Sequence, residues 1–428
     1  MSAPRSRLLR QRWVFWLCAI ATGLICYACT PVSTQDPATG NQPIELNLWQ
    51  GINPPPNRDV FDRLVDRFNA NHLDIQVNSI YAGQSEQQMP KVLTAVVGDV
   101  PPDILWFSPT ATGKFIDLDA IVPLDDWFAD STTAQNLDPA LREAMVMDDR
   151  ICSVPMATNN VGIFYRPSLF EEAGIEKLPT TWAEFAEVSQ QLSTDADRHG
   201  MLLPLGKGEW TVFTWLPFLY SAGGDPIRDG LPTLATPEAQ SALELWATAI
   251  DNDSAILSQP ERGFELDDFL AGRVAMQLTG PWTLEQLNAS GVDYGVMPIP
   301  QQKEAATIVG GEHLFVMKTD PAREAAALEF LEYALSEEFQ TEWAIGTGYL
   351  PVNLKSRESQ EYREYVASRP VLDVFLNQMV VARSRPIVSG YTRLSDALGR
   401  AIEQALLGES PEVALAQAQE RIDRFWGS

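Results

Sequence analysis

After the polar stretch that ends near residue 42, segments in which apolar residues alternate with polar ones are followed by segments in which apolar residues recur every three or four positions. Residues 45–51 and 75–81 alternate apolar with polar positions, which predicts two half-buried strands. A helical spacing separates the strands, with apolar residues at Val60, Phe61, Leu64, Val65 and Phe68. Asn57 is the expected N-cap of that helix. A second helical segment precedes the short apolar run 103–107. The order strand–helix–strand–helix–strand predicts the α/β fold class.

Capping signals mark the start of later helices. Thr181 is followed three residues later by Glu184, which predicts a capping box. Thr236 and Asp320 each precede a proline, which is tolerated in the first turn of a helix. We expect one helix to continue from Asp320 through Trp343 and a last helix to span about 392–407. The roughly 400 residues that follow the N-terminal segment are enough for two domains.

The first 28 residues have the composition of a secretory signal peptide. Residues 1–12 carry four arginines and no acidic residue, and the seventeen residues 13–29 are uncharged. Seventeen residues is at the short edge for a membrane span, so an uncleaved anchor remains an alternative. Residues 29–42 are polar and rich in Pro, Thr and Gln, which predicts a flexible tether.

Cys29 follows Tyr27 and Ala28 in an arrangement that is similar to the cleavage box of bacterial lipoproteins. In such a box the cysteine becomes lipidated. Cys26 stands where the box usually has leucine, so ordinary signal cleavage nearby is the alternative. The sequence predicts lipidation of Cys29 and a periplasmic or extracytoplasmic protein that is held at the membrane by a lipid anchor.

The predicted mature chain is strongly acidic. Removal of residues 1–28 leaves 27 basic and 57 acidic side chains, a net charge of roughly −30. This balance argues against nucleic acid and anionic membrane surfaces as partners. An anionic ligand would need a local basic pocket. The twelve tryptophans suit a pocket in which aromatic rings stack on sugar rings.

Signatures of catalysis and metal binding are missing from the sequence. The three histidines are far apart, and neither a phosphate-binding loop nor a nucleophile elbow occurs. After signal removal only Cys152 accompanies Cys29, which excludes a paired-cysteine zinc site. The adjacent acids 125–126 and 267–268 are candidate carboxylates for a glycosidase, and we expect them to be solvated instead. The sequence predicts a protein that is not an enzyme and needs no metal or cofactor.

Five segments stand in an order that resembles one protein family. They are GDVPPDILWF, ICSVPMATNNVGIFYRPSLFEEAGIEKLPTTWAEF, FLAGRVAMQLTGPW, YGVMPIP and VGGEHLFVMKTDPAREAAALEFLEYAL. They resemble the extracellular sugar-binding proteins of bacterial ABC importers, the maltose-binding and glycerol-3-phosphate-binding group. The resemblance covers about residues 44–407. TGYLPVN, residues 347–353, is most similar to the glycerol-3-phosphate branch.

The resemblance implies a two-lobe α/β fold of the type II periplasmic-binding-protein kind, in which crossing strands join the lobes and ligand lies in the cleft between them. The lobe boundaries that it implies are 43–153 with 309–340 for lobe 1, and 154–308 with 341–428 for lobe 2.

Candidate ligand contacts follow from the chemistry of sugars. Carboxylates and amides suit hydroxyl groups, and aromatic rings suit the C–H faces of the sugar ring. In open α/β sheets ligands lie beyond the carboxyl ends of strands. The candidates at such ends are Trp49, Gln84, Glu86, Trp106 and Phe107. Because side chains alternate along a strand, we expect only one of the last two to face the cleft.

Matches to the resembled family add further candidates. Asn159 stands where maltose-binding members carry an acidic ligand contact, and Trp282 matches a stacking tryptophan. Tyr349 matches the tyrosine of the GYLP segment. Gly310 and Gly311 would let the backbone approach a ligand closely. Glu312, Trp210 and Trp215 are further candidates. Arg385, together with Arg383 and Tyr391, stands where the glycerol-3-phosphate branch uses a phosphate-binding arginine.

The sequence as a whole predicts a monomeric solute receptor. It would capture a sugar, an oligosaccharide or a polyol derivative by lobe closure and deliver it to the permease and ATPase of an ABC importer. A phosphorylated polyol, such as glycerol-3-phosphate, is a second ligand class for the same kind of receptor. Two different functions stay open beside the receptor: a secreted carbohydrate-active hydrolase and a signalling receptor subunit.

Overall fold

The computed structural model describes residues 42–194, 198–205, 209–259 and 266–426. The predicted signal peptide and Cys29 lie outside these ranges, so their assignments stay predictions, as do the lobe boundaries. Within the described ranges, no helix combines the length and the apolarity that a membrane crossing requires.

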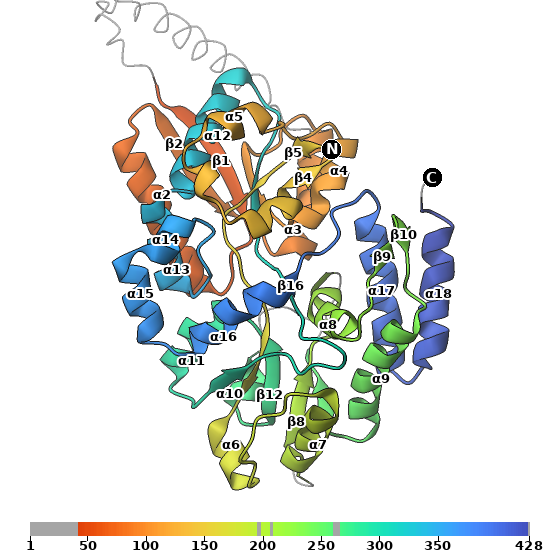
Figure 1. Cartoon of the computed structure of the whole chain (residues 1–428). Helices are drawn as coiled ribbons and strands as arrows, with labels where there is room; N and C mark the ends of the chain where they lie inside the picture. The colour runs from red at the N-terminus through yellow and green to blue at the C-terminus, as the bar shows by residue number, and fades with distance from the viewer. Residues whose placement is uncertain (1–41, 195–197, 206–208, 260–265, 427–428) are drawn as a thin grey trace, which may run out of the picture. The chain divides into compact units, whose positions relative to one another are not determined.

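The first lobe is built around a five-stranded sheet with the order β2-β1-β3-β15-β6. Figure 1 shows β1 and β2 of this sheet next to each other. Its strands are β1 (Ile44–Gln50), β2 (Ile75–Tyr81), β3 (Ile104–Phe107), β6 (Val154–Pro155) and β15 (His313–Val316). β2, β1 and β3 are parallel, whereas β15 is antiparallel to both of its neighbours. Its principal helices are α2 (Pro55–Asn71), α3 (Ser85–Val97), α12 (Pro321–Ala334) and α13 (Glu337–Thr347). The apolar face of α2 that the sequence predicted is buried in this lobe's core.

The second lobe repeats the pairing pattern around the sheet β11-β8-β12-β7-β13. Its strands are β7 (Gly162–Tyr165), β8 (His199–Leu203), β11 (Ala255–Leu257), β12 (Val274–Thr279) and β13 (Gly295–Met297). β11, β8 and β12 are parallel, and β7 is antiparallel to both of its neighbours, β12 and β13. Its principal helices are α7 (Trp182–Leu192), α8 (Glu209–Ser221), α9 (Pro237–Asp251), α17 (Tyr391–Leu406) and α18 (Pro411–Asp423). The predicted two-lobe α/β fold is confirmed.

Shorter elements connect these parts. The helices are α4 (Thr112–Asp117), α5 (Asp125–Asp130), α6 (Pro167–Glu172), α10 (Asp267–Leu270), α11 (Leu284–Ser290), α14 (Leu354–Glu358), α15 (Gln360–Ala367) and α16 (Val371–Gln378). The short strands are β4 (Val146–Met147), β5 (Arg150–Ile151), β9 (Ile227–Arg228), β10 (Leu231–Pro232), β14 (Thr307–Ile308) and β16 (Ala382–Arg383).

Two connecting segments pair with each other where the chain passes between the sheets. The chain leaves β6 at Pro155 and enters β7 at Gly162, and it returns between β13 and β15. The backbone N–H of Asn159 donates to the carbonyl of Gly310 over 3.1 Å, and the N–H of Gly310 donates back over 2.8 Å. Gly311 has a φ of +113°, and a Cβ there would lie 2.1 Å from the carbonyl oxygen of Ala157. The pairing therefore requires glycine at this position.

Most of the predicted helix starts are confirmed, and one is wrong. Thr181 and Glu184 form the capping box of α7, and the side chains of Thr236 and Asp320 cap α9 and α12. Asn57 does not cap α2, which already begins at Pro55. Asn57 is instead buried within that helix.

The predicted helix from Asp320 through Trp343 is two helices. α12 ends at Ala334, and the side chain of Ser336 caps α13 by accepting from the backbone N–H of Phe339. A serine that can hydrogen-bond a nearby N–H favours a new start over continuation. The last predicted helix corresponds to α17, and α18 follows it in the same core.

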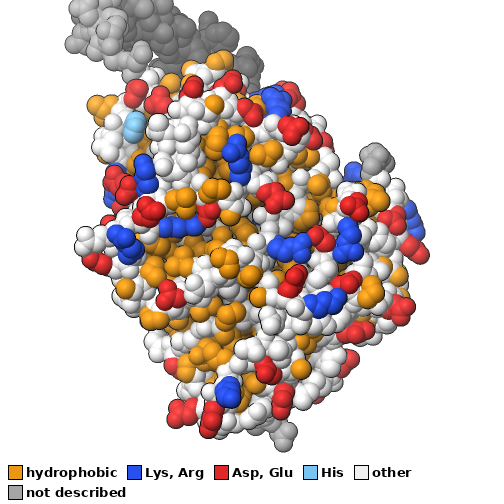
Figure 2. Space-filling model, in the orientation of Figure 1, with side chains coloured by type: hydrophobic (Ala, Val, Ile, Leu, Met, Phe, Trp, Pro, Cys, Tyr) orange, Lys and Arg blue, Asp and Glu red, His pale blue; other side chains and the backbone are white. Residues whose placement is uncertain are grey.

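Acidic side chains are distributed over the face shown in Figure 2, with lysines and arginines interspersed among them. The net negative charge of the chain is therefore spread over this face rather than concentrated in one patch.

Candidate ligand-binding cavity

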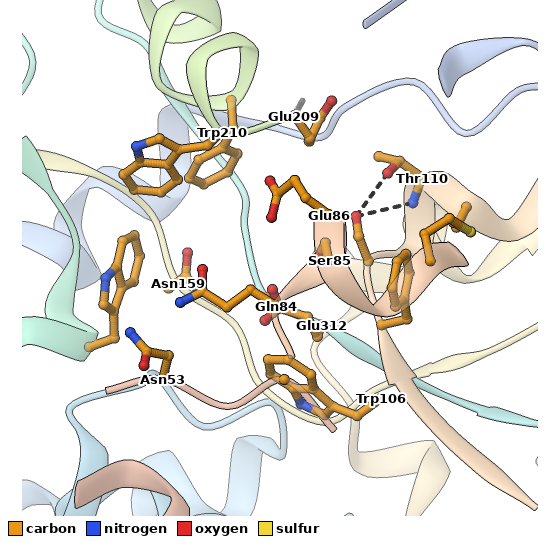
Figure 3. A pocket seen from close by; sticks show the side chains of 18 of the residues that line it. Asn53, Gln84, Ser85, Glu86, Trp106, Thr110, Asn159, Glu209, Trp210 and Glu312 are labelled. Atoms are coloured by element: carbon orange, nitrogen blue, oxygen red, sulfur yellow. Dashed lines mark hydrogen bonds between the residues drawn. The ribbon is translucent and has the colours of Figure 1, made fainter. Parts of the chain in front are cut away.

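A cavity of about 400 Å³ is lined by residues of both lobes (Figure 3). Ten of the eleven predicted ligand contacts line it: Gln84, Glu86, Trp106, Phe107, Asn159, Trp282, Gly311, Glu312, Tyr349 and Arg385. The structure thus brings together residues that the sequence separates widely. The exception is Trp49.

Trp49 lies away from the cavity because side chains along a strand point alternately to opposite faces of the sheet. It is the neighbour of Leu105 in the pairing of β1 with β3. Its partly buried ring packs against the hydrophobic cluster that contains Leu105 and Phe115. The chain after β1 reaches the cavity with Gly51 and Asn53 instead.

Trp106 and Phe107 both line the cavity, which corrects the expectation that only one would. Alternation holds within the strand, since the two rings belong to different hydrophobic clusters. However, β3 ends at Phe107, and the chain turns at once into a short 3-10 helix, η1 (Pro109–Ala111). The space beyond the strand end is open to both side chains.

The start of α3 supplies two polar contacts from one turn. Gln84 is the N-cap residue, but its side chain makes no capping hydrogen bond. Its amide is therefore available to the cavity. Glu86 stands in the first turn, and its side chain extends into the cavity (Figure 3). An acid in the first helical turn is favoured by the helix dipole, which explains how this carboxylate is accommodated.

Two buried polar atoms at the cavity have no hydrogen-bond partner among the described residues. They are Nε1 of Trp106 and Oδ1 of Asn159. Trp106 is 5% exposed and Asn159 is 3% exposed, so bulk water reaches neither freely. An unsatisfied buried polar group costs about 1–3 kcal/mol. Each atom has almost no accessible surface, so a ligand reaches them only when neighbouring side chains shift.

Aromatic rings form a continuous row along part of the cavity. Phe213 and Trp210 have ring centroids 6.0 Å apart, Trp210 and Trp282 6.2 Å, and Trp282 and Tyr349 6.4 Å. These four rings, here called the aromatic side, come from α8, from the 3-10 helix η4 (Pro281–Thr283) and from the loop after α13. Trp215, another candidate, is instead fully buried in the core of the second lobe.

Arg385 lines the cavity as one member of a hydrogen-bonded group around Glu209. Its guanidinium donates to Glu209 Oε1 over 3.1 Å and lies 4.9 Å from the centre of the Phe213 ring. Tyr391 also donates to Glu209 Oε1, over 2.8 Å, and the hydroxyl of Ser395 donates to Oε2. Glu209 is therefore saturated by its own neighbours.

The ionisation of this group is set by burial and by Glu209. Burial opposes the charge of Arg385, but the Glu209 carboxylate outweighs it and raises the pKa of the guanidinium above its ordinary value. Burial, followed by the same carboxylate, raises the pKa of Tyr391 well above its ordinary value. Arg385 is consequently a charged arginine whose charge is already balanced.

The neighbouring candidate Arg383 does not line the cavity. It pairs with Asp225, and its guanidinium lies 4.2 Å from the centre of the Tyr220 ring. Of the two arginines that resembled a phosphate-binding residue, only Arg385 reaches the cavity.

Carboxylates outnumber cations among the described residues that line the cavity. Four lining residues are acidic: Glu86, Glu209, Glu312 and Asp396. They are here called the acidic side, and Arg385 is the one basic residue among the described lining residues. Glu209 and Glu312 both act electrostatically on that arginine. Glu86 makes no ion pair with any described residue.

A family model for bacterial extracellular solute-binding proteins matches residues 63–370, well over half of the chain. The chain belongs to this family. The assignment fits a fold of two similar α/β lobes with a cavity lined by both, and it confirms the family that the sequence resembled.

Relatives and solved structures of this family cover nearly the whole chain. The sn-glycerol-3-phosphate-binding periplasmic protein UgpB of Pectobacterium atrosepticum is 23% identical over 94% of this chain and 95% of its own length. The cyclic alpha-maltosyl-1,6-maltose binding protein of Arthrobacter globiformis is 28% identical, with a TM-score of 0.76 over 89% of this chain and 98% of its own. UgpB of Mycobacterium tuberculosis, solved with glycerophosphocholine, is 22% identical, with a TM-score of 0.80 over 90% and 98%.

Several lining residues were not predicted from the sequence. Asn53 follows a strand end, a position that could have drawn attention to it. Tyr391 of α17 was a candidate and lines the cavity, whereas Glu209 and the following α17 residues Thr392, Ser395 and Asp396 had no such signal. Their place in the cavity depends on contacts across more than 170 residues, such as the hydrogen bond from Tyr391 to Glu209.

Proposed function

We propose that the protein captures a carbohydrate without a phosphate group and delivers it to the permease and ATPase of an ABC importer. The aromatic side suits the C–H faces of sugar rings, and the amides and carboxylates suit their hydroxyls. Lobe closure around the ligand would present the loaded receptor to the permease. The predicted lipid anchor on Cys29 would hold the receptor close to that permease.

The pairing of Arg385 with Glu209 is the observation that favours an uncharged or cationic ligand over a ligand with a phosphate group. A phosphate in the cavity would have to compete with Glu209 for the guanidinium. It would also approach the other carboxylates of the acidic side, and like charges brought together in a confined site repel each other. The UgpB relatives keep glycerol-3-phosphate as the second candidate ligand, because an arginine does reach the cavity.

A hydrolase remains the weaker alternative. The adjacent acids considered for a glycosidase, Asp125 with Asp126 and Asp267 with Asp268, do not line the cavity. Asp268 instead pairs with Arg273. Incubation of the purified protein with a bound oligosaccharide should leave the oligosaccharide intact, and release of smaller sugars would favour the hydrolase.

Thermal unfolding with a ligand panel tests the proposed function. The panel contains neutral mono-, di- and trisaccharides, sn-glycerol-3-phosphate and glycerophosphocholine. A neutral sugar present at one hundred times its dissociation constant should add about 2.7 kcal/mol of stability. Glycerol-3-phosphate should add none. Stabilisation by glycerol-3-phosphate and by no sugar would transfer the assignment to phosphorylated polyols. A panel without any stabilising carbohydrate would contradict the proposal.

A further inference from the structure

We infer that the ligand carries a positively charged nitrogen, as an amine-bearing saccharide does, and that Glu86 is the residue that binds it. This inference rests on the proposed function and narrows its ligand class. Two independent observations carry it: the charge balance of the cavity, which favours a cation, and the row of aromatic rings in the cavity, which favours a sugar.

The charge balance leaves Glu86 as the unmatched one of the four described lining carboxylates. Glu312 acts electrostatically on Arg385. Glu209 is hydrogen-bonded to Arg385, Tyr391 and Ser395. Asp396 pairs with Arg400 one turn along the same helix, with 3.1 Å between Oδ2 and Nε. No described basic side chain pairs with Glu86.

Two basic residues of this lobe, Lys91 on the helix of Glu86 and Arg58 on α2, are engaged elsewhere. Lys91, on the same helix, donates to the carbonyl of Ala82 over 2.7 Å. Arg58 lies 4.0 Å from the centre of the Tyr81 ring. Neither residue lines the cavity. When a ligand displaces water from the cavity, the Glu86 carboxylate loses hydration, and a cation on the ligand would offset that loss.

The aromatic rings suit the same ligand. The rings cover the apolar face of a sugar whether or not the sugar carries an amine. The Glu86 carboxylate favours a cation on that sugar, whereas a phosphate would meet repulsion from Glu86. A neutral sugar would use the rings and leave the charge of Glu86 unmatched.

Matched ligand pairs test the inference by calorimetry at a pH of about 6, where amines of this kind are protonated and carboxylates ionised. The pairs are glucosamine with glucose, galactosamine with galactose, and the disaccharide of β-1,4-linked glucosamine with cellobiose. The two members of each pair differ only in that each sugar ring carries an amine in place of one hydroxyl. We expect at least one aminated member to bind about tenfold more tightly than its partner, as a charge-assisted hydrogen bond contributes. This preference should fade at a pH of about 9.5, where the amine is neutral.

Glu86→Gln identifies the residue responsible. The substitution keeps the shape and hydrogen bonding of the side chain and removes its charge. It should reduce the tenfold preference to less than threefold and change neutral-sugar binding little. Glu361→Gln is the matched control, because Glu361 also stands in the first turn of a helix, α15, and does not line the cavity. The control should keep the full preference.

The outcomes separate this inference from the proposed function. Equal binding of aminated and neutral sugars, or binding of neutral sugars alone, would overturn the inference and leave the proposed function standing. Retention of the preference in Glu86→Gln would overturn the assignment to Glu86. Choline is tested as a cation without a sugar. If choline binds more tightly than every amino sugar, the inference that the cation belongs to a saccharide is wrong. Absence of binding by any carbohydrate would contradict both proposals.

Discussion

The aromatic side and the acidic side of the cavity constrain a ligand in different ways. The rings of the aromatic side contact each other over centroid distances of 6.0–6.4 Å and hold one another in place. On the acidic side, Arg385, Tyr391 and Ser395 donate to Glu209 and hold it in place. Rings bind a sugar face regardless of the charge of the ligand, whereas carboxylates select for charge. Affinity and charge selectivity are therefore carried by different residues and can be altered separately.

The largest expected effect comes from removing the cation of the acidic side. Arg385 is 9% exposed and its partner Glu209 22% exposed, so Arg385→Met leaves a largely buried carboxylate without its cation. Breaking a buried pair in this way typically costs about 3–5 kcal/mol. We expect a loss of about 3 kcal/mol in the free energy of unfolding, measured with urea.

Arg383→Met is the matched control for this prediction. Arg383 stands two residues earlier and has the same arrangement, a carboxylate partner and an aromatic ring beneath it, but it is 38% exposed. Exposed pairs contribute about 0–1 kcal/mol. Equal losses in the two variants would show that the acidic side does not depend on Arg385.

The next effect is the pH dependence of the free energy of unfolding. This dependence must be measured before ligand binding is compared at different pH values. His313 is buried in β15, and burial, followed by the charge of Arg385, lowers its pKa to about 3. The hydroxyl of Ser153 lies 2.9 Å from His313 Nδ1. Between the folded pKa and the ordinary value of about 6.5, only the unfolded chain binds the proton. Stability therefore falls as pH decreases below about 6.5, by about 1.4 kcal/mol per pH unit.

Urea unfolding at several pH values between about 7 and 5 measures this dependence. The total loss should reach about 2 kcal/mol at pH 5. His313→Asn should flatten the slope in this interval, since asparagine does not titrate. Carboxylates with lowered pKa values, such as Asp293, lose their contribution at lower pH and leave this window clear. An unchanged slope in the variant would assign the dependence to another group.

The sequence predicted the aromatic side better than the acidic side, for a physical reason. The resemblance to the family led to Trp282 and Tyr349 of the aromatic side. A strand end, which is visible as a local pattern, led to Trp106 elsewhere in the cavity. Trp49 has the same signals, yet the alternation of β1 turns its ring to the opposite face. A shift of one residue along β1 decides which face of the sheet the Trp49 ring lies on, and the sequence alone did not show which face that is.

The acidic side depends on contacts that have no local pattern. Arg385 was predicted as a phosphate contact, but its pairing with Glu209 spans 176 residues. No spacing rule could indicate that pairing. α8, which carries Glu209, is buried on all sides over most of its length, so no apolar stripe shows which residues face the cavity.

The fold was predictable wherever capping residues and periodic apolar positions agree, as at Thr181 and Asp320. It was less predictable where tertiary contacts prevail. Asn57 is an example, because its amide donates to the carbonyl of Trp282 over 3.4 Å instead of capping α2. The break between α12 and α13 was missed because residues on both sides of it favour helix.

The smallest effect, and the one that tests the aromatic side, is the loss of affinity in Trp282→Ala. Trp282 is the ring that connects Trp210 with Tyr349, and its own ring is partly exposed at the cavity. Its removal should weaken the binding of neutral and aminated sugars by the same factor, about tenfold, or about 1.4 kcal/mol. Trp49→Ala removes an equal ring outside the cavity. It should change ligand affinity less than twofold, whatever its effect on stability. Calorimetry with one neutral and one aminated sugar measures both variants. A loss confined to the aminated sugar would mean that Trp282 selects for charge, and the division of labour between the two sides would then be wrong.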